Sequence, residues 1–143
     1  MIYFDTSFVI PKYVTEATSE KVEAVLLSLS SEQLTISQWT RVEFVSMLAR
    51  RVRMQELTEE QALKVFALFE QEVKESFNLI IPTEADFELA IHFLHQYQTG
   101  LRAGDALHLA ISKNYRVTML YTLDNELLKA ASTLNIPAMG LSN

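Results

Sequence analysis

The sequence predicts an α/β protein in which helices cover both faces of a parallel sheet. Its predicted strands are short and apolar and do not alternate with polar residues, which is typical of parallel strands buried on both faces. Longer amphipathic segments separate these strands along the chain. The 143 residues contain no internal repeat, linker or low-complexity segment, so we expect residues 1–143 to form a single domain.

The first half of the chain contains two predicted strands and three predicted helices. The strands are the apolar runs 2–4 and 34–36. Apolar residues recur at helical spacing over 17–30, and a second helix is expected over 38–54. The capping-box sequence Thr58-Glu59-Glu60-Gln61 opens the third helix.

The second half continues the alternation of strands and helices. Pro82 stops the first strand, and Thr83 then caps a helix that we expect Gly100 to end. The mostly apolar segment 105–113 predicts a short buried helix, and Asp124 opens the last helix. The three strands expected here are 77–81, 117–121 and a weak one at 136–139.

Composition excludes several classes of protein. An apolar fraction of 49% excludes a disordered chain. The absence of cysteine excludes disulfides, cysteine-rich zinc sites and a thiol nucleophile. There is no apolar run long enough to span a bilayer, and the N-terminus does not have the form of a signal peptide, so a cytoplasmic protein is expected. The net charge of −6 argues against non-specific coating of nucleic acid.

Two of the four aspartates follow predicted strands. Asp5 lies before the hydroxyls of Thr6 and Ser7, and Asp124 follows Thr122. Sites in open parallel sheets form beyond the carboxyl ends of the strands, so the two carboxylates would converge if their strands were neighbours. Strand order is not given by the sequence, and the same residue types also serve as ordinary helix N-caps.

The other acidic candidates lie within predicted helices. Glu43 either closes a capping box with Thr40 or, if the helix begins at Ser37, lies a full turn inside it, where it needs solvent or a partner. Asp105 either interacts with the helix dipole or directs its carboxylate into a shared site. Asp86 lies away from these motifs, and we expect Asp86→Asn to show neither relief of charge repulsion in the metal-free protein nor loss of a response to metal.

In their order along the chain, these motifs resemble the PIN domain family, and within it the small VapC toxins of bacterial toxin–antitoxin pairs. The resemblance covers essentially the whole chain. It implies a single-domain α/β/α sandwich with a short, mostly parallel central sheet, in which the first and fourth strands are neighbours. It also implies an acidic quartet and two accessory hydroxyls, which in this sequence are Asp5, Glu43, Asp105 and Asp124, and Ser7 and Thr122.

The function implied by the resemblance is endoribonuclease activity that depends on Mg²⁺ or Mn²⁺. In the implied mechanism a metal-activated water attacks an RNA phosphodiester in line. The implied partners are RNA, a second copy of the chain, and a VapB-like antitoxin whose basic C-terminal segment enters the acidic pocket. The chemistry of the residues agrees, because hard divalent cations prefer oxygen ligands and four converging carboxylates could not all stay ionised without one.

Basic residues add a candidate contact with RNA phosphates. Arg41, Arg50, Arg51 and Arg53 share the helix of Glu43, and Arg50 lies on the same face as Glu43. Arg50, and after it Arg41, are the candidates for contacting phosphate. The alternative is a solvated helix end whose cations favour the C-terminal dipole.

The three histidines and Asn125 are weaker candidates. His92 and His95 could hold a transition metal, but a pair on the solvent side of an amphipathic helix is the commoner situation. We hypothesise that His108, one turn after Asp105, packs behind the site. Asn125 follows Asp124, but an asparagine in a first helical turn is ordinary.

Other functional classes remain open at this stage. An aspartate after the first strand also occurs in phosphoaspartyl enzymes and receiver domains, but the additional acids and the lysine that those proteins need are not visible. The chain could equally be a PIN-like nuclease of RNA processing without a toxin role. A third alternative is a non-catalytic interaction domain in which the acidic residues are helix caps.

Overall fold

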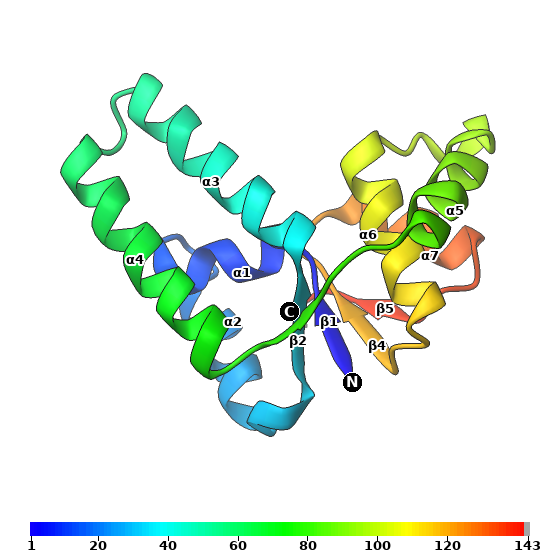
Figure 1. Cartoon of the computed structure of the whole chain (residues 1–143), viewed down its shortest axis with the longest axis horizontal. Coiled ribbons are helices and arrows are strands. Elements are labelled where there is room, and N and C mark those ends of the chain that lie inside the picture. Colours follow the sequence, from blue (N-terminus) through cyan, green and yellow to red (C-terminus); the bar gives the residue numbers. More distant parts are fainter. Residues whose placement is uncertain (142–143) are drawn as a thin grey trace.

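The computed structural model describes residues 1–141 and contains a five-stranded sheet in the order β3-β2-β1-β4-β5. All of its strand pairs are parallel. Figure 1 shows α1 to α4 on one side of this sheet and α5 to α7 on the other. The strands are β1 (Ile2–Phe4), β2 (Leu34–Ser37), β3 (Asn78–Ile80), β4 (Met119–Tyr121) and β5 (Ala138–Met139). The predicted α/β class with helices on both faces is confirmed.

Seven α-helices lie within the described residues. They are α1 (Thr6–Tyr13), α2 (Ser19–Ser28), α3 (Gln38–Arg53), α4 (Glu59–Glu75), α5 (Glu84–Leu94), α6 (Ala103–Asn114) and α7 (Asn125–Thr133). Six of them follow the predicted order. No helix of the described residues is long and apolar enough to cross a membrane.

The sheet order brings the ends of β1 and β4 together. In the register of this pair, Phe4 lies opposite Tyr121, so Asp5 and the loop after β4 leave the sheet at the same edge. β1 also pairs with β2, whose last residue, Ser37, precedes α3. The chain therefore reverses its strand order at β1, where an open parallel sheet forms its crevice.

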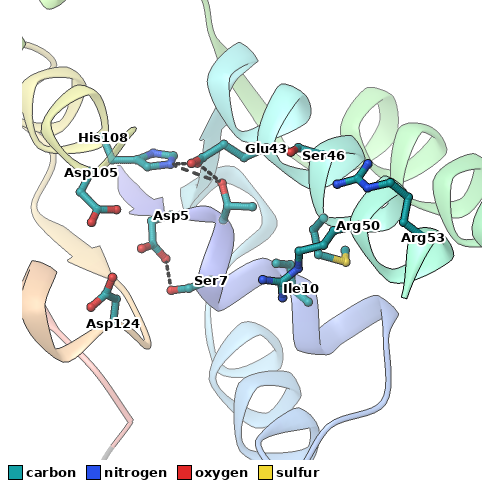
Figure 2. Close-up of a pocket in the computed structure, with 12 residues that line it drawn as sticks. Asp5, Ser7, Ile10, Glu43, Ser46, Arg50, Arg53, Asp105, His108 and Asp124 are labelled. Atoms are coloured by element: carbon teal, nitrogen blue, oxygen red, sulfur yellow. Dashed lines mark hydrogen bonds and ion pairs between the residues drawn. The ribbon is translucent and has the colours of Figure 1, made fainter. Parts of the chain in front are cut away.

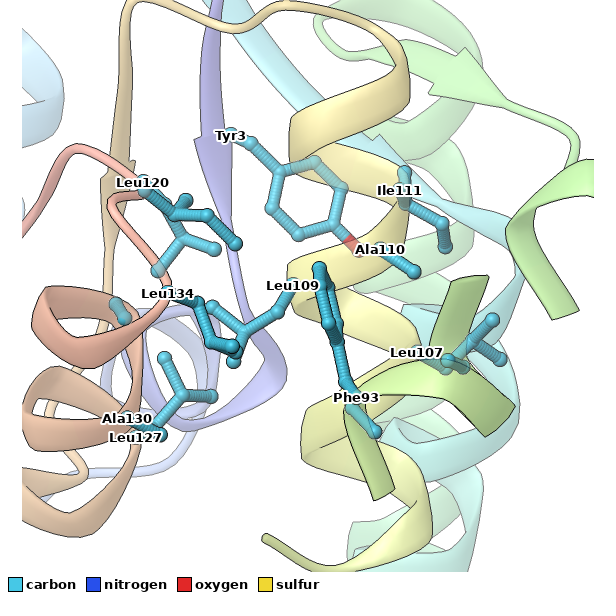
Figure 3. Packing of buried hydrophobic residues seen from close by; sticks show 14 of the residues in the cluster. Tyr3, Phe93, Leu107, Leu109, Ala110, Ile111, Leu120, Leu127, Ala130 and Leu134 are labelled. Atoms are coloured by element: carbon cyan, nitrogen blue, oxygen red, sulfur yellow. The ribbon is translucent and has the colours of Figure 1, made fainter. Parts of the chain in front are cut away.

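Two apolar cores fix the sheet between its helices. Along β1, Ile2 and Phe4 belong to the core beneath α1 to α4, whereas Tyr3 belongs to the opposite core. Figure 3 shows this second core, in which Tyr3 and Leu120 from the strands pack against Leu109 of α6 and Leu127 of α7. Because successive strand residues point to opposite faces, both faces of β1 and β2 are buried.

Helices α1, α5 and α6 show the main differences between the prediction and the structure. No helix was expected over α1, because the run from Thr6 to Ile10 is rich in β-branched and aromatic residues and Pro11 follows it. Helix α5 ends at Leu94, and Gly100 instead ends a short 3₁₀ turn in a left-handed conformation with φ of 67°. Helix α6 begins before Asp105, so this residue is the third of the helix.

Candidate active site

A pocket of about 380 Å³ opens at the carboxyl edge of the sheet. Figure 2 shows the side chains of Asp5, Asp105 and Asp124 at one end of this pocket, with Glu43 on the adjacent helix α3. These four carboxylates are far apart in sequence and come from the ends of β1 and β4 and from α3 and α6. All four predicted quartet residues therefore line one pocket.

Asp5 is the most buried of the four acids, with an exposed fraction of 3%. Its Oδ1 accepts hydrogen bonds from the Ser7 hydroxyl at 2.7 Å and from the Phe8 backbone N–H at 3.1 Å. Its Oδ2 accepts from the Thr122 hydroxyl at 2.6 Å. Burial raises the pKa of Asp5 above its usual value, although His108 and these hydrogen bonds act against the rise.

Asp124 combines a capping role with a place in the pocket. Its Oδ1 accepts from the Glu126 and Leu127 backbone N–H groups at 2.9 and 3.4 Å, so it is the N-cap of α7. Asp5 is likewise the N-cap of α1. The capping interpretation is therefore correct for both residues. It does not exclude a second role, because each carboxylate also lines the pocket.

The two predicted accessory hydroxyls join the ends of β1 and β4. The oxygens of Ser7 and Thr122 lie 3.2 Å apart, and Ser7 Oγ accepts from the Leu123 backbone N–H at 2.9 Å. The Asp124 backbone N–H donates to Thr122 Oγ1 at 3.0 Å. Both hydroxyls also donate to Asp5, so they fix the orientation of its carboxylate.

Glu43 lies in the second turn of α3 rather than in a capping box with Thr40. The N-cap of α3 is Ser37, whose backbone N–H donates to Thr40 Oγ1 at 3.2 Å. The Oε1 atom of Glu43 accepts from the Thr6 hydroxyl at 2.6 Å and lies 2.5 Å from His108 Nε2. Burial acts to raise the pKa of Glu43, but the hydrogen bond and charge of His108, together with Thr6, lower it below the usual value.

Asp105 has no hydrogen-bond partner among the described residues. The N-cap of α6 is Arg102, so Asp105 is not a cap. Burial, with the nearby negative charges of Asp124, Asp5 and Glu43, raises its pKa from 3.8 to about 6, against a smaller opposing effect of His108. The Asp105 carboxylate is therefore repelled by its neighbours, and no described residue donates a hydrogen bond to compensate.

The donor chemistry of the pocket fits a hard divalent cation. Its ligands would be carboxylate oxygens, which Mg²⁺ and Mn²⁺ prefer, and no lysine or arginine of the described chain forms an ion pair with Asp5, Asp105 or Asp124. As the side chains stand, no three acids or histidines of residues 1–141 lie close enough to share one ion. Some rotation of these carboxylates would therefore accompany binding.

The sequence profile of the PIN domain matches residues 2–132. The chain belongs to the PIN domain family. This match decides against the phosphoaspartyl and receiver alternatives. No curated protein matches the chain.

Solved structures with the same fold include toxin–antitoxin proteins. The FitAcB structure from Neisseria gonorrhoeae has a TM-score of 0.76 and 19% identity, covering 97% of this chain and 96% of that one. VapC20 from Mycobacterium tuberculosis, a sarcin–ricin loop cleaving toxin, has a TM-score of 0.73 and 18% identity over 91% and 95% of the two chains. A toxin–antitoxin complex from Klebsiella pneumoniae has a TM-score of 0.61 and 18% identity over 87% of each chain.

The arginines of α3 separate into two groups in this PIN domain. Arg50 and Arg53 line the same pocket as the acids, and Figure 2 shows them at its opposite end. Neither forms an ion pair within the described residues. Arg41 points elsewhere: its guanidinium forms an ion pair with Glu70 of α4, with Nε 2.9 Å from Oε2. The structure thus brings Arg50, but not Arg41, to the pocket.

Two residues near the acids were not singled out from the sequence. Thr6 was read only as part of the Asp-Thr-Ser run, yet it hydrogen-bonds Glu43. Gly104, directly before Asp105, lies against the Glu43 carboxylate. The packing of His108 behind the site agrees with the hypothesis, since its ring is 1% exposed and contacts Glu43. His92 on α5 and His95, which directly follows this helix, are both exposed.

Proposed function

We propose that this PIN domain is an endoribonuclease that requires Mg²⁺ or Mn²⁺ and acts in the cytoplasm as the toxin of a toxin–antitoxin pair. The observation that carries the proposal is the convergence of four carboxylates on one pocket, with Asp105 left without a donor. RNA as the substrate class is what the resemblance to the VapC toxins implies, and VapC20, which shares this fold, is a sarcin–ricin loop cleaving toxin.

Asp5, Glu43, Asp105 and Asp124 would hold the cation. A divalent cation bound there would lower the pKa of a water molecule and would offset the charge that develops on the phosphate. In the proposed hydrolysis water attacks the phosphorus in line, the phosphorus–oxygen bond to one ribose breaks, and the leaving oxygen takes a proton. Ser7 and Thr122 keep Asp5 in one orientation throughout.

The basic end of the pocket would bind the RNA backbone. Arg50 and Arg53 are exposed and continue the pocket away from the acids, so phosphates on either side of the scissile bond could meet opposite ends. If Arg50 contacts one phosphate, Arg50→Ala should reduce the slope of log affinity against log salt by about one. The variant should fold almost as well as wild type. An unchanged slope would assign Arg50 to the solvated surface.

Two apolar surfaces beside α3 are available for protein partners. Val42 of α3 and Phe87 of α5 are 57% and 52% exposed and line one of them. Val45 of α3 and Leu63 of α4 line the other, and are 43% and 67% exposed. Exposed apolar patches of this kind mark interaction sites. We propose that a second copy of the chain and an antitoxin cover these surfaces, and that a basic segment of the antitoxin enters the acidic pocket.

Cleavage of RNA by the purified protein tests the nuclease. RNA should be cut in the presence of Mg²⁺ or Mn²⁺, and EDTA should stop the reaction. Glu84→Gln is the matched control for variants that remove a carboxylate from the pocket, because Glu84 is an exposed acid in the first turn of α5. Cleavage that survives exhaustive chelation would contradict the metal mechanism.

Growth after expression separates a toxin from a nuclease of RNA processing. The wild type should arrest growth of a host that lacks the antitoxin, and Asp5→Asn should not. Co-expression of a short reading frame from directly upstream of the gene should restore growth if it encodes the antitoxin. Equal growth of wild type and variant at matched protein levels would remove the toxin role and leave the nuclease standing.

A further inference from the structure

A chain of buried polar groups lies behind Glu43. Tyr3 and Ser37 are 0% exposed, and His108 is 1% exposed. The Tyr3 hydroxyl lies 2.8 Å from Ser37 Oγ and 2.6 Å from His108 Nδ1, and His108 Nε2 lies 2.5 Å from Glu43 Oε1. The metal chemistry proposed above uses none of Tyr3, Ser37 or His108, so their arrangement requires a separate explanation.

The hydrogen bonds of this chain hold the imidazole from both sides. An ionised carboxylate only accepts, so Nε2 of His108 donates to Glu43 whether the ring is neutral or charged. The Tyr3 hydroxyl can donate to Nδ1 or accept from it, and therefore serves both states of the ring. Buried hydrogen bonds in series are stronger than exposed ones, and here they end on a single oxygen of Glu43.

The other oxygen of Glu43 lies against Gly104. A Cβ added at Gly104 would lie 2.8 Å from Glu43 Oε2, and its next neighbours would be Trp39 Nε1 at 3.4 Å and Trp39 Cζ2 at 3.5 Å. The backbone of Gly104 has no positive φ, so it does not require glycine. Glycine is otherwise unfavourable inside a helix. The feature that distinguishes this position is the room it leaves for the carboxylate.

We propose that Tyr3, His108 and Gly104 are positioning residues that hold the Glu43 carboxylate in one place, with Oε1 anchored and Oε2 available to a bound cation. No described residue donates a hydrogen bond to Oε2, which fits this arrangement. The inference rests on the proposed function, since it takes Glu43 to be a metal ligand. A glutamate has three rotatable bonds and this one is 29% exposed, so without the anchor it would lose more freedom on binding.

Titration calorimetry with Mn²⁺, in the absence of RNA, measures the effect directly. Removing a group that orients a metal ligand weakens affinity by about 10- to 100-fold. His108→Leu should weaken Mn²⁺ binding by this amount. Tyr3→Phe should weaken it by less, because neither of the two hydrogen bonds that it loses reaches Glu43 directly. His108→Gln should recover part of the loss, since its side-chain amide offers an N–H near the position of Nε2.

Gly104→Ala provides the second variant, and it does not depend on the buried chain. The only contact closer than 3.0 Å is with the far end of a flexible side chain, so the protein should fold at least as well as wild type. Mn²⁺ affinity should nevertheless fall about tenfold, because Glu43 must move. Thermal melting without metal checks the folding of every variant.

Ser112→Ala is the matched control for His108. Ser112 lies in the same helix, is 1% exposed and donates to the backbone oxygen of His108 at 2.9 Å, but it does not touch Glu43. If it weakens Mn²⁺ binding as much as His108→Leu does, the effect is a general loosening of α6 and the inference is wrong. If His108→Leu and Gly104→Ala bind Mn²⁺ like wild type, the inference is wrong and the metal site stands. If wild type itself binds no Mn²⁺, the metal site and the inference both fail.

Discussion

Asp86 and Asp105 occupy the same position in two packed helices and have opposite surroundings. Each is the third residue of its helix, α5 or α6. Asp86 is 1% exposed, and its two oxygens accept from the Thr83 backbone N–H at 2.8 Å and from Asn114 Nδ2 at 2.7 Å. Asp105 is only partly buried, accepts no hydrogen bond within the described chain, and lies near three other acids.

The difference separates a structural carboxylate from one with no structural function. Protein donors satisfy Asp86, as buried polar groups normally require. Nothing in the described chain satisfies Asp105, so its surroundings favour a ligand from outside the protein. Asp86→Asn should lower stability, because an amide cannot accept from both Thr83 and Asn114 in the same way.

The largest expected effect is on RNA cleavage by Asp105→Asn. Loss of a carboxylate that holds the cation should lower the cleavage rate by about 100-fold or more, since even outer partners of a metal site are worth about 10- to 100-fold. Asp86→Asn should keep a rate close to wild type per folded molecule. Rates are measured well below the melting temperature of each variant. An equal loss in both variants would erase the distinction between the two aspartates.

The next largest effect is on folding stability, where Asp86 should matter more than Asp105. Asp86→Ala leaves the Thr83 N–H and the Asn114 amide without their partner, and should lower the free energy of unfolding by about 2–4 kcal/mol. Asp105→Ala removes no hydrogen bond and relieves the repulsion of its neighbours, so it should raise the free energy of unfolding by about 1 kcal/mol near neutral pH rather than lower it. Urea denaturation of the metal-free proteins measures both values. A large loss for Asp105→Ala would reveal a structural role for this residue.

The sequence predicted the fold class and, for three of the four acids, the kind of element at whose end or start they lie. Asp5, Asp105 and Asp124 follow from polar residues placed at strand ends or helix starts. Glu43 required the choice of Ser37 over Thr40 as the helix start, which depends on local hydrogen bonds that residue types alone do not determine. Convergence of the four acids depends on β1 pairing with β4, and strand order is a long-range property.

The partners of His108 behind the site could not be predicted for the same reason. His108 and Tyr3 are separated by 105 positions, and no local pattern indicates that their side chains meet. Gly104 is conspicuous only once α6 is seen to approach α3. Helix α1 was missed because its local propensity favours a strand, whereas tertiary packing of Phe8 and Val9, 0% and 1% exposed, stabilises the helix.

The pH dependence of stability gives a third, smaller difference. Because the folded protein raises the pKa of Asp105 from 3.8 to about 6, it binds this proton more tightly than the unfolded chain does. The unfolding free energy should therefore fall as pH rises from about 4 to about 6. A pKa difference of about two corresponds to about 3 kcal/mol, which solvent around this half-buried side chain reduces to about 1 kcal/mol.

Asp105→Asn tests this dependence. The metal-free variant should be more stable than wild type by about 1 kcal/mol near neutral pH, and the decline between about pH 4 and 6 should flatten. Guanidinium unfolding at a series of pH values measures the difference between the two proteins. An unchanged pH profile would mean that Asp105 does not experience the repulsion of its neighbours.

The smallest effect on stability is expected for Asp124→Asn, which lies between the two cases compared above. Asn and Asp are nearly equal N-caps, and Asn can still accept from the Glu126 and Leu127 N–H groups through its amide oxygen. The free energy of unfolding of the metal-free variant should therefore change by only a few tenths of a kcal/mol, as the weaker interaction with the helix dipole and the relief of repulsion near Asp105 offset each other.

Wild type should melt at a higher temperature when Mn²⁺ is added, because the cation binds the folded state, and Asp124→Asn should lose most of this increase. Thermal melting with and without Mn²⁺ checks both expectations, with Glu84→Gln as the control that should retain the full increase. A variant that keeps the Mn²⁺ response would leave Asp124 as a helix cap alone, and the comparison would then place it with Asp86 rather than with Asp105.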